Sequence, residues 1–430
     1  MAEQPIEVVV ELAAGQVLAG RLYSHRGRGS ESASFVYETD YLGRPDAYAL
    51  DPALPLVQGT LQTPVELAMF RAFADSTPDR WGRRLVTRAE RRRAAAEQTT
   101  PRSLGEIDFL LGVRDDLRQG AVRFRDQASG QFLASDDIGV PGLTDLPRLV
   151  QAAEHLDTDE ETELELRDLL QVGSSLGGAR PKAHVVDADG RVAIAKFPSA
   201  LHDTWNVMAW EKVSLDLARE AGIRVPDSRL LWLGRRSVLI VNRFDREGDR
   251  RIGYVSAMTM LEASDGGGGS YLEIAAVIEQ FSPRASDDLR ELWRRIAFSI
   301  LISNIDDHLR NHGFLHVGTG TWTLSPAFDL NPNPEPGPKQ LSTAIDGYDT
   351  AASIQTLMTV AGRFRLTDAA AADVLGDVLA ATARWREEAA RQGLPESEVA
   401  EMDWAFEHPE VGAARSLLGL ADQTTGRADR

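Results

Sequence analysis

Cysteine is absent from this chain of 430 residues. Without cysteine the protein can form neither disulfide bonds nor thiolate-ligated metal sites, so nothing in it requires an oxidising compartment. Long apolar runs are absent too, since none approaches the roughly 20 residues that cross a bilayer. The opening letters, MAEQPIEVVVEL, contain no basic segment followed by a long apolar core. We therefore expect a cytoplasmic protein that has no membrane partner.

Positive charge is in short supply. The chain has 47 Lys and Arg residues against 65 Asp and Glu residues, which gives a formal net charge of −18. Proteins hold DNA without regard to sequence by neutralising its phosphates with Lys and Arg, so this balance argues against a general grip on nucleic acid. Any contact with DNA would have to be local or supplied by a partner. With 43% hydrophobic and 26% charged residues, the composition is that of a globular protein.

The patterns along the chain divide it into three parts and predict an α+β protein. Residues 1–145 begin with strand-like alternation that suggests a hairpin, and then become helical. Residues 146–250 start with an acidic helical stretch. From Gly173 they continue as a small-residue loop, two strands, one helix and two further strands. Residues 251–430 are mainly helical.

A basic segment lies within the first part. Between Arg80 and Arg102 there are eight arginines and only two acidic residues, Glu90 and Glu97. One interpretation is the solvated face of a helix, and the other is a docking patch for a partner or for DNA. The sequence alone leaves both open.

Polar chemistry is concentrated in the stretch SNIDDHLRNHGFL, residues 303–315, just after an apolar helical run. Asp306 and Asn311 are five residues apart, and Asp329 follows Asn311 by eighteen, beyond strand-like segments. In protein kinases the base Asp precedes a metal-binding Asn by five residues, and a second metal-binding Asp follows. Phosphoryl transfer needs such a carboxylate, together with hard oxygen ligands for Mg²⁺.

A kinase also needs a cation for the phosphates, and Lys196 at the end of the strand-like VAIAK is the candidate. Glu211, fifteen residues later in a predicted helix, could pair with it. Before the first strand lies a loop whose small residues are Gly173, Ser174, Ser175, Gly177 and Gly178. Backbone N–H groups of such a loop can cradle phosphates. Taken singly, the loop reads as a turn, Lys196 as a solvated edge residue and Asp329 as a turn or helix-cap residue. Their order along the chain favours a kinase.

The histidines offer a rival interpretation. His308, His312 and His316 recur every four residues, and on a helix they would form one metal-binding face, as in a metal hydrolase. Gly313 and the strand-like FLHV speak against a helix that continues through His316.

Five segments, SSLGGARPK, AKFP, NRFDR, DDHLRNHGF and LSPAFDLNP, together resemble the HipA family of serine/threonine kinases, the toxins of type II toxin–antitoxin systems. The resemblance covers about residues 170–335. It extends more faintly to FADSTPDRWGRRL in the first part. It implies a protein-kinase-like two-lobed fold with an N-terminal β-rich subdomain and an all-α C-terminal lobe.

The resemblance also implies roles for single residues. Asp306 would be the catalytic base, His308 would support its loop, and Asn311 and Asp329 would be the Mg²⁺ ligands. Val241 to Phe244 would form the adenine hinge. The residues implied in binding ATP are Ser174, Ser175, Leu176, Gly177, Gly178, Ala179, Lys182, Lys196, Glu211, Val241, Arg243, Phe244, Asp306, His308, Asn311 and Asp329. Lys196 would contact the α and β phosphates.

Ser175 is similar to the serine that the family phosphorylates on itself to become inactive. The sequence departs from the family at Arg180-Pro181, which often reads Gln-Glu or Gln-Pro, and this leaves the contacts of Lys182 open. It also departs at Asp307, where some members have glycine. That carboxylate could add a ligand or remain in solvent.

For partners, the resemblance implies a HipB-like helix-turn-helix antitoxin that carries most of the contact with DNA. The implied protein substrate is a translation factor, such as an aminoacyl-tRNA synthetase. The alternative is a catalytically silent pseudokinase that serves as a corepressor. The presence of Lys196, Asp306, Asn311 and Asp329 argues against it.

Overall fold

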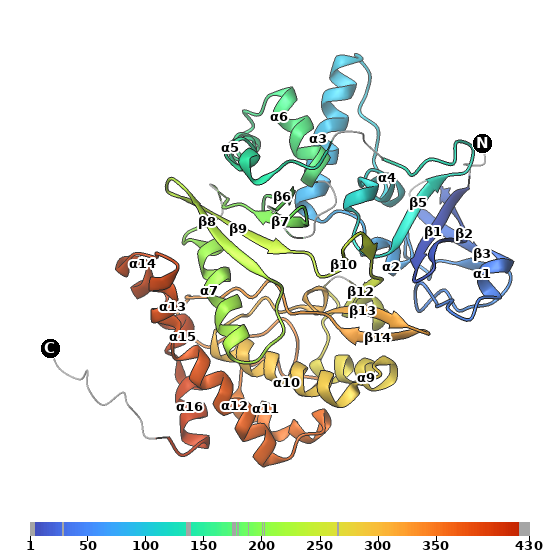
Figure 1. Cartoon of the computed structure of the whole chain (residues 1–430). Coiled ribbons are helices and arrows are strands. Elements are labelled where there is room, and N and C mark those ends of the chain that lie inside the picture. The colour runs from blue at the N-terminus through green and yellow to red at the C-terminus, as the bar shows by residue number, and fades with distance from the viewer. Residues whose placement is uncertain are drawn as a thin grey trace. The chain divides into compact units, whose positions relative to one another are not determined.

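The computed structural model shows two compact units, each built from separated stretches of the chain (Figure 1). The residues that the structure describes are 5–27, 30–134, 139–173, 178, 180–187, 189–199, 201, 203–264 and 266–420. Unit 1 comprises Met1–Thr204, Leu231–Glu262 and Leu315–Thr321, and unit 2 comprises Trp205–Leu230, Ala263–Phe314 and Trp322–Arg430. The units do not divide at residues 145 and 250, so the three-part division stays a prediction about sequence.

The first sheet of unit 1 is antiparallel and five-stranded. Its strands in spatial order are β4 (Thr60–Gln62), β3 (Glu31–Tyr37), β2 (Gly15–Arg26), β1 (Ile6–Leu12) and β5 (Val122–Asp126). β1 and β2 form the predicted hairpin. Phe35 and Phe124 are fully buried, and both meet Phe73 edge to face. This aromatic contact fixes one face of the sheet against the core.

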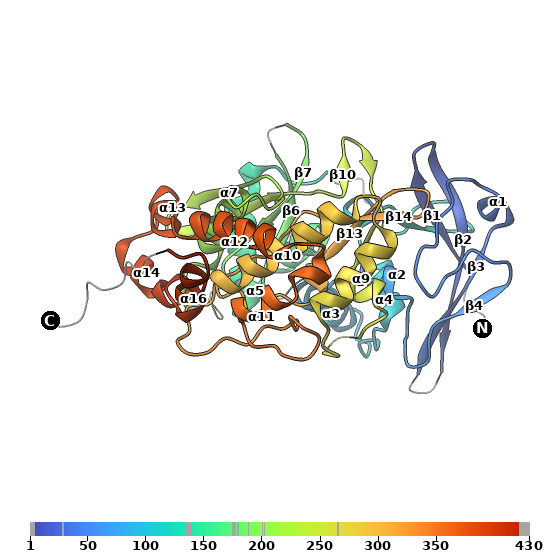
Figure 2. The same ribbon diagram turned by 90° about the horizontal axis from the view of Figure 1, so that it is seen from below.

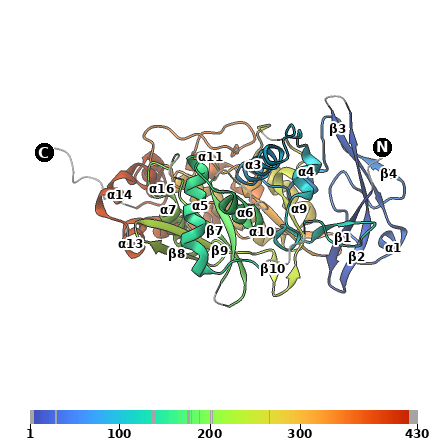
Figure 3. The same ribbon diagram turned by 90° about the horizontal axis from the view of Figure 1, so that it is seen from above.

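A second sheet has the order β6 (Lys182–Val186), β7 (Val192–Lys196), β9 (Arg236–Asn242) and β8 (Ser228–Leu233). It contains the four strands predicted after the small-residue loop. Three helices pack against it (Figure 3): α3 (Arg80–Ala96), α5 (Leu146–Asp157) and α6 (Glu163–Gly173). Trp81, Leu149 and Leu169 of these helices join Val185 and Ile240 of the strands in one apolar cluster. The basic segment is therefore one wall of a core.

Unit 1 also has several short elements. They are α1 (Thr39–Leu42), α2 (Arg71–Ala74), α4 (Glu106–Leu111), β10 (Arg246–Glu247), β11 (Arg250–Arg251), β12 (Tyr254–Ser256) and α8 (Ala257–Met260).

Unit 2 is mainly helical and is organised around α10 (Figure 2). Its helices are α7 (Val207–Glu220), α9 (Tyr271–Phe281), α10 (Ala285–Leu301), α11 (Ile354–Thr359), α12 (Asp368–Thr382), α13 (Trp385–Arg391), α14 (Glu396–Glu401), α15 (Asp403–Phe406) and α16 (Pro409–Leu417). The apolar face predicted for α10 is confirmed, because Leu292, Trp293 and Ile296 are fully buried. α10 packs against α9, α11 and α12.

One hairpin interrupts the helices of the C-terminal part. It consists of β13 (Gly313–Gly318) and β14 (Thr321–Leu324), which are the two segments whose letters look strand-like. The Ser325 N–H donates to the Gly313 carbonyl at 2.8 Å and closes its base. Within the described ranges, every helix is too short or too polar to span a bilayer.

Candidate active site

The loop after α10 holds the predicted catalytic base. It begins at Ser303, which adopts a left-handed conformation with φ 55° and so ends the helix. A short 3₁₀ turn, Leu309–Asn311, follows the base. The Asp306 carbonyl accepts hydrogen bonds from the His308 N–H at 2.9 Å and from Asn311 Nδ2 at 3.0 Å. Asp306 itself is exposed. The backbone of the base is thus fixed, while its side chain lies where a substrate hydroxyl could reach it.

Asp307 has the opposite environment. Its carboxylate is buried and accepts hydrogen bonds from Tyr271 Oη at 2.6 Å and Ser299 Oγ at 3.2 Å, and it lies 3.0 Å from His312 Nε2. The Asp307 carbonyl accepts a further bond from Thr343 Oγ1 at 2.6 Å. Burial would raise the pKa of the Asp307 carboxyl, but His312 and the hydrogen bonds hold it below its usual value. Of the two alternatives for this residue, the one that leaves it in solvent is wrong, because its buried side chain anchors the base loop to α9 and α10.

Asp329 lies on an extended segment that is hydrogen-bonded to the base loop. The Asn333 N–H donates to the carbonyl of Ser303, the first residue of that loop, at 3.2 Å. On the other side of Asp329, the Ala327 N–H donates to the Arg224 carbonyl at 2.7 Å. Asp329 has φ 59°, a left-handed conformation that Asp tolerates better than most residues. No helix follows it in the described residues 325–336, so it is not a helix-cap residue. The structure thus brings the segment of the second predicted Mg²⁺ ligand to the start of the base loop.

The chemistry of these side chains fits Mg²⁺. Because Asn311 Nδ2 is committed to the Asp306 carbonyl, Oδ1 is the atom left for a cation. Asn331 Nδ2 donates to Asp329 Oδ1 at 3.2 Å. The buried Oδ1 of Asn331 has no hydrogen-bond partner among the described residues. Carboxylate and amide oxygens of this kind are the ligands that Mg²⁺ prefers.

In unit 1, Lys196, predicted to contact the phosphates, is a neighbour of Lys182, whose contacts the sequence left open. Lys182 of β6 and Lys196 of β7 are directly opposite one another in the antiparallel ladder, so their side chains share one face of the sheet. A Cβ added to Gly178 would lie 2.5 Å from Lys182 Nζ, so this ammonium lies against the glycine loop. Two ammonium groups on one face of a sheet are suited to contact the oxygens of a polyphosphate.

Two further parts of the predicted nucleotide site are the small-residue loop and Glu211. Ser174, Ser175, Leu176, Gly177 and Ala179 lie outside the described residues, and their roles stay predictions. Glu211 is on α7 and is 2% exposed. Its pairing with Lys196 stays a prediction.

The structure places Arg243 differently from the prediction that it binds nucleotide. Its guanidinium is buried, and it donates to both carboxylate oxygens of Asp245, to the Leu117 carbonyl at 2.6 Å and to His184 Nε2 at 3.0 Å. Its Nη2 also donates to the Arg118 carbonyl. The side chain is therefore committed to the protein, and a hinge at Val241 to Phe244 would have to contact adenine through other atoms.

In the segment NRFDR, residues 242–246, Asp245 has a role that the sequence did not show. It is 3% exposed and accepts bonds from Arg243, from Arg246 at 2.8 Å and from the Gly120 N–H at 2.8 Å. Burial opposes its ionisation, but the two arginines hold the pKa of the Asp245 carboxyl below its usual value. The acid between Phe244 and Arg246 in NRFDR was the only available signal.

The three histidines do not form a metal site. The chain passes through the 3₁₀ turn into β13, so the helix needed to align them is absent from the described residues 302–318. His312 lies against Asp307, and His316 stacks on Tyr48 with ring centroids 3.9 Å apart. The described residues contain no cluster of three or more His, Asp or Glu side chains that could hold a metal. The metal-hydrolase interpretation therefore loses its geometric basis.

Buried histidines predict a pH dependence of stability. Burial lowers the pKa of His184 well below its usual value, that of His316 to about 4, and that of His408 to a lesser extent. Below about pH 6.5 these histidines become protonated in the unfolded chain but stay neutral in the folded chain. The free energy of unfolding should therefore fall as pH falls. Each histidine contributes at most about 1.4 kcal/mol per pH unit. Urea titrations from pH 7.5 to 5 would measure the slope.

A variant of His316 tests how much of this pH dependence of stability comes from that residue. His316→Phe keeps an aromatic ring on Tyr48 but removes the titrating group, so its stability should depend less on pH than that of the wild type. Val317→Ser, at a neighbouring exposed residue, should keep the wild-type slope. Equal slopes in all three proteins would contradict the assignment.

The arginines of the basic segment are mostly paired with acidic residues of unit 1, although their side chains stay partly exposed. Six of the eight form ion pairs. The pairs are Arg83 with Glu106, Arg84 with Asp157, Arg88 with Asp159 and Glu161, Arg92 with Glu161, and Arg93 and Arg102 with Glu90. In the described part of the chain only Arg80 and Arg91 of this segment have no ion pair, which leaves little for a docking patch.

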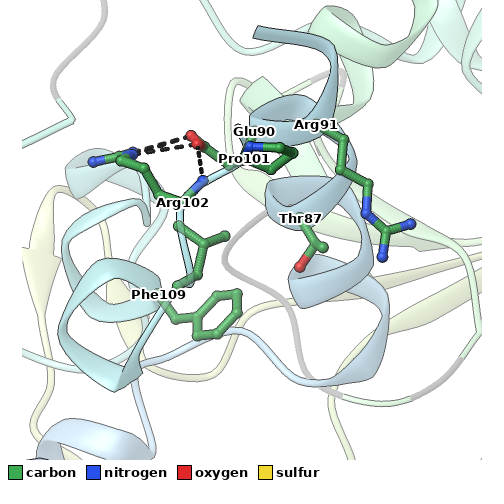
Figure 4. Close-up of a pocket in the computed structure, with 7 residues that line it drawn as sticks. Thr87, Glu90, Arg91, Pro101, Arg102 and Phe109 are labelled. Atoms are coloured by element: carbon green, nitrogen blue, oxygen red, sulfur yellow. Dashed lines mark hydrogen bonds and ion pairs between the residues drawn. The ribbon is translucent and has the colours of Figure 1, made fainter. Parts of the chain in front are cut away.

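A surface pocket of about 310 Å³ lies beside α3 (Figure 4). It is lined by Thr87, Glu90, Arg91, Pro101, Arg102, Leu104 and Phe109. Figure 4 shows Arg102 turned toward Glu90, while Arg91 points away from it. The side-chain hydrogen bonds from Arg93 and Arg102 hold the pKa of the Glu90 carboxyl below its usual value. None of the predicted site residues lines this pocket.

Comparison with known proteins gives the class of the chain. The family described as the HipA-like C-terminal domain matches residues 174–385. The backbone resembles that of HipA in the solved complex of Shewanella oneidensis HipA, HipB and operator DNA, with a TM-score of 0.65 over 96% of this chain and 98% of that chain. At 16% identity this likeness shows the fold alone. Residues 174–385 thus match a HipA-like C-terminal domain, in agreement with the resemblance predicted over about residues 170–335, and the backbone has the fold of that HipA chain.

Two curated relatives are similar in sequence. One, named putative kinase Y4dM, from Sinorhizobium fredii, is 32% identical over 176 residues, which are 37% of this chain and 40% of the relative. The other, a putative kinase of Haemophilus influenzae, is 25% identical over 193 residues, 38% of this chain and 55% of the relative. The matches thus span only about half the length of these relatives.

Proposed function

We propose that the protein is an ATP- and Mg²⁺-dependent serine/threonine kinase of the HipA type. The observation that carries the proposal is the pair of opposed lysines, Lys182 and Lys196, beside Gly178. The exposed Asp306 on a rigid loop supplies the second half of the chemistry. Names of kinases among the relatives and the matched domain support the same reaction.

In this proposal the roles follow from the environments of the side chains. The ammonium groups of Lys182 and Lys196 neutralise phosphate oxygens. Asp306 accepts the proton of a Ser or Thr hydroxyl as its oxygen attacks the γ-phosphorus and ADP leaves. Asn311 and Asp329 would hold Mg²⁺, which supplies neutralisation of the triphosphate charge. The buried Asp307 keeps the base loop in place for the transfer.

Partners and substrates enter the proposal by likeness. The solved relative is in a complex with HipB and operator DNA. We propose a HipB-like helix-turn-helix antitoxin that supplies most of the DNA contact, in agreement with the net charge of −18 and with the internal pairing of the α3 arginines. The proposed substrates are a translation protein, such as an aminoacyl-tRNA synthetase, and Ser175 of the chain itself. Phosphate on Ser175 would place about −1.5 to −2 charges where ATP phosphates bind.

The decisive test is incubation of the purified chain with radiolabelled ATP and Mg²⁺, followed by mapping of the labelled residue. We expect label on Ser175 in the chain alone, and on Ser or Thr of a synthetase when one is added. The same reaction with EDTA should give no label. ATP binding without any transfer, in the presence of candidate substrates, would favour the pseudokinase alternative.

A further inference from the structure

The first residue before α3 has an unusual use. Asp79 is the N-cap of α3, where an Asp side chain normally accepts a hydrogen bond from the first turn of its own helix. Here it makes no such capping bond. Its Oδ2 instead accepts the N–H of Gly178 at 2.6 Å, 99 residues away. The side chain at the N-cap of α3 thus binds the backbone of Gly178 instead of capping its own helix.

The neighbouring Trp81 holds the same loop at two further points. Its backbone N–H donates to the Gly178 carbonyl at 3.2 Å, so both polar backbone groups of this glycine are held by the start of α3. Its indole Nε1 donates to the Lys182 carbonyl at 2.9 Å. The ring is 1% exposed and lies against Gly173, where an added Cβ would come within 3.0 Å of Nε1. Trp81 therefore contacts both residues that flank the loop, Gly173 and Lys182.

Gly178 is held in a conformation that favours glycine. Its φ of +89° is rarely adopted by other residues, and an added Cβ would collide with Lys182 Nζ. The glycine backbone, fixed by Asp79 and Trp81, thus forms part of the wall against which the lysine ammonium lies. A shift of Gly178 would change the position of that charge.

A second network reaches the far side of the loop from the same helix. Arg84 of α3 pairs with Asp157 at 2.7 Å, and Asp157 accepts the Ser199 hydroxyl at 3.0 Å. The Ser199 N–H donates to Asp203, whose other oxygen accepts Arg180 Nε at 2.8 Å. Arg180, the residue that departs from the family pattern, is therefore tied to α3 through three intermediates.

We propose that Asp79 and Trp81 are positioning residues for ATP, because they set the places of Gly178 and Lys182 at the phosphate end of the nucleotide site. This inference rests on the proposed kinase function and extends it to the N-terminal half of the chain. A positioning role at the phosphates predicts a loss that depends on phosphates. The affinity for ATP should fall, while that for adenosine should not.

Asp79→Ala tests the inference by calorimetric titration with Mg·ATP and, separately, with adenosine. We expect the Kd for ATP to rise about tenfold or more, as for the loss of a charge-assisted hydrogen bond, and the Kd for adenosine to stay within about twofold. Asp79→Asn should recover most of the ATP affinity, since the amide oxygen can still accept the Gly178 N–H. Arg80→Ala, at the next and exposed residue, is the matched control and should match the wild type.

Trp81→Phe gives a second route, because it keeps the ring in the core and removes only the donor to the Lys182 carbonyl. It should show the same difference between ATP and adenosine, with a KM effect larger than its kcat effect. Equal losses for ATP and adenosine, or an unchanged ATP affinity in Asp79→Ala, would overturn the inference while leaving the kinase intact. A wild-type chain that bound no ATP would overturn the proposed function and this inference with it.

Discussion

Asp306→Asn is expected to reduce phosphoryl transfer by about 10²–10⁴-fold, the range for loss of a general base. The change keeps the size of the side chain and the carbonyl that accepts bonds from His308 and Asn311. Affinity for Mg·ATP should therefore stay close to that of the wild type. Initial rates of labelled phosphate transfer, together with calorimetric ATP titration, measure the two quantities.

The matched control is Asp373→Asn, the same chemical change on an exposed residue of α12. It should alter neither transfer nor ATP affinity. Wild-type transfer rates in Asp306→Asn would refute the assignment of the base. The pseudokinase alternative makes a different forecast, in which both proteins bind ATP and neither transfers phosphate.

Asp307→Ala is expected to destabilise the protein by about 1–3 kcal/mol or more, the cost of leaving a buried hydrogen-bonding group unsatisfied. The Tyr271 hydroxyl would lose its buried acceptor, and the His312 ring would lose the carboxylate that lies 3.0 Å from its Nε2. Asp307→Asn, which keeps one oxygen acceptor, should lose less. Urea unfolding followed by tryptophan fluorescence gives the free energy of unfolding.

Asp306→Ala is the control for this prediction, because the same atoms are removed one residue earlier on an exposed side chain. Its free energy of unfolding should change by less than about 0.5 kcal/mol. The two variants thus separate stability from catalysis in adjacent aspartates: Asp306→Ala should be stable and inactive. A loss below about 1 kcal/mol in Asp307→Ala would contradict the anchoring role.

Several features could be predicted from sequence because they depend on neighbouring residues. The β1–β2 hairpin follows from alternating residues around a glycine turn, and the buried face of α10 follows from helical spacing. The spacing of Asp306 and Asn311 was enough to place both on one short loop. The strand-like letters of β13 also spoke against the histidine metal site.

The arginines show where such reasoning ends. Arg84 and Arg88 read as solvated when only their own segment is considered. In the fold they pair with Asp157 and Glu161, 73 residues later, because α3 packs against α6. The side chain of Arg243 is a similar case, since its carbonyl partner at Leu117 comes from a distant part of the chain. A local sequence pattern does not indicate which distant carboxylate or carbonyl will bind a charged side chain after folding.

The order of the candidate groups can be read from the amino acids alone: a glycine loop, a strand lysine, a glutamate, a base loop and a second aspartate, in a chain without cysteine and with an excess of acidic residues. The fold was needed to show that Asp306 is exposed and Asp307 buried, and that the N-cap of α3 holds Gly178. The physical reason is that residue type and spacing fix local conformation, whereas the energy of a charge or a backbone N–H depends on what surrounds it after folding.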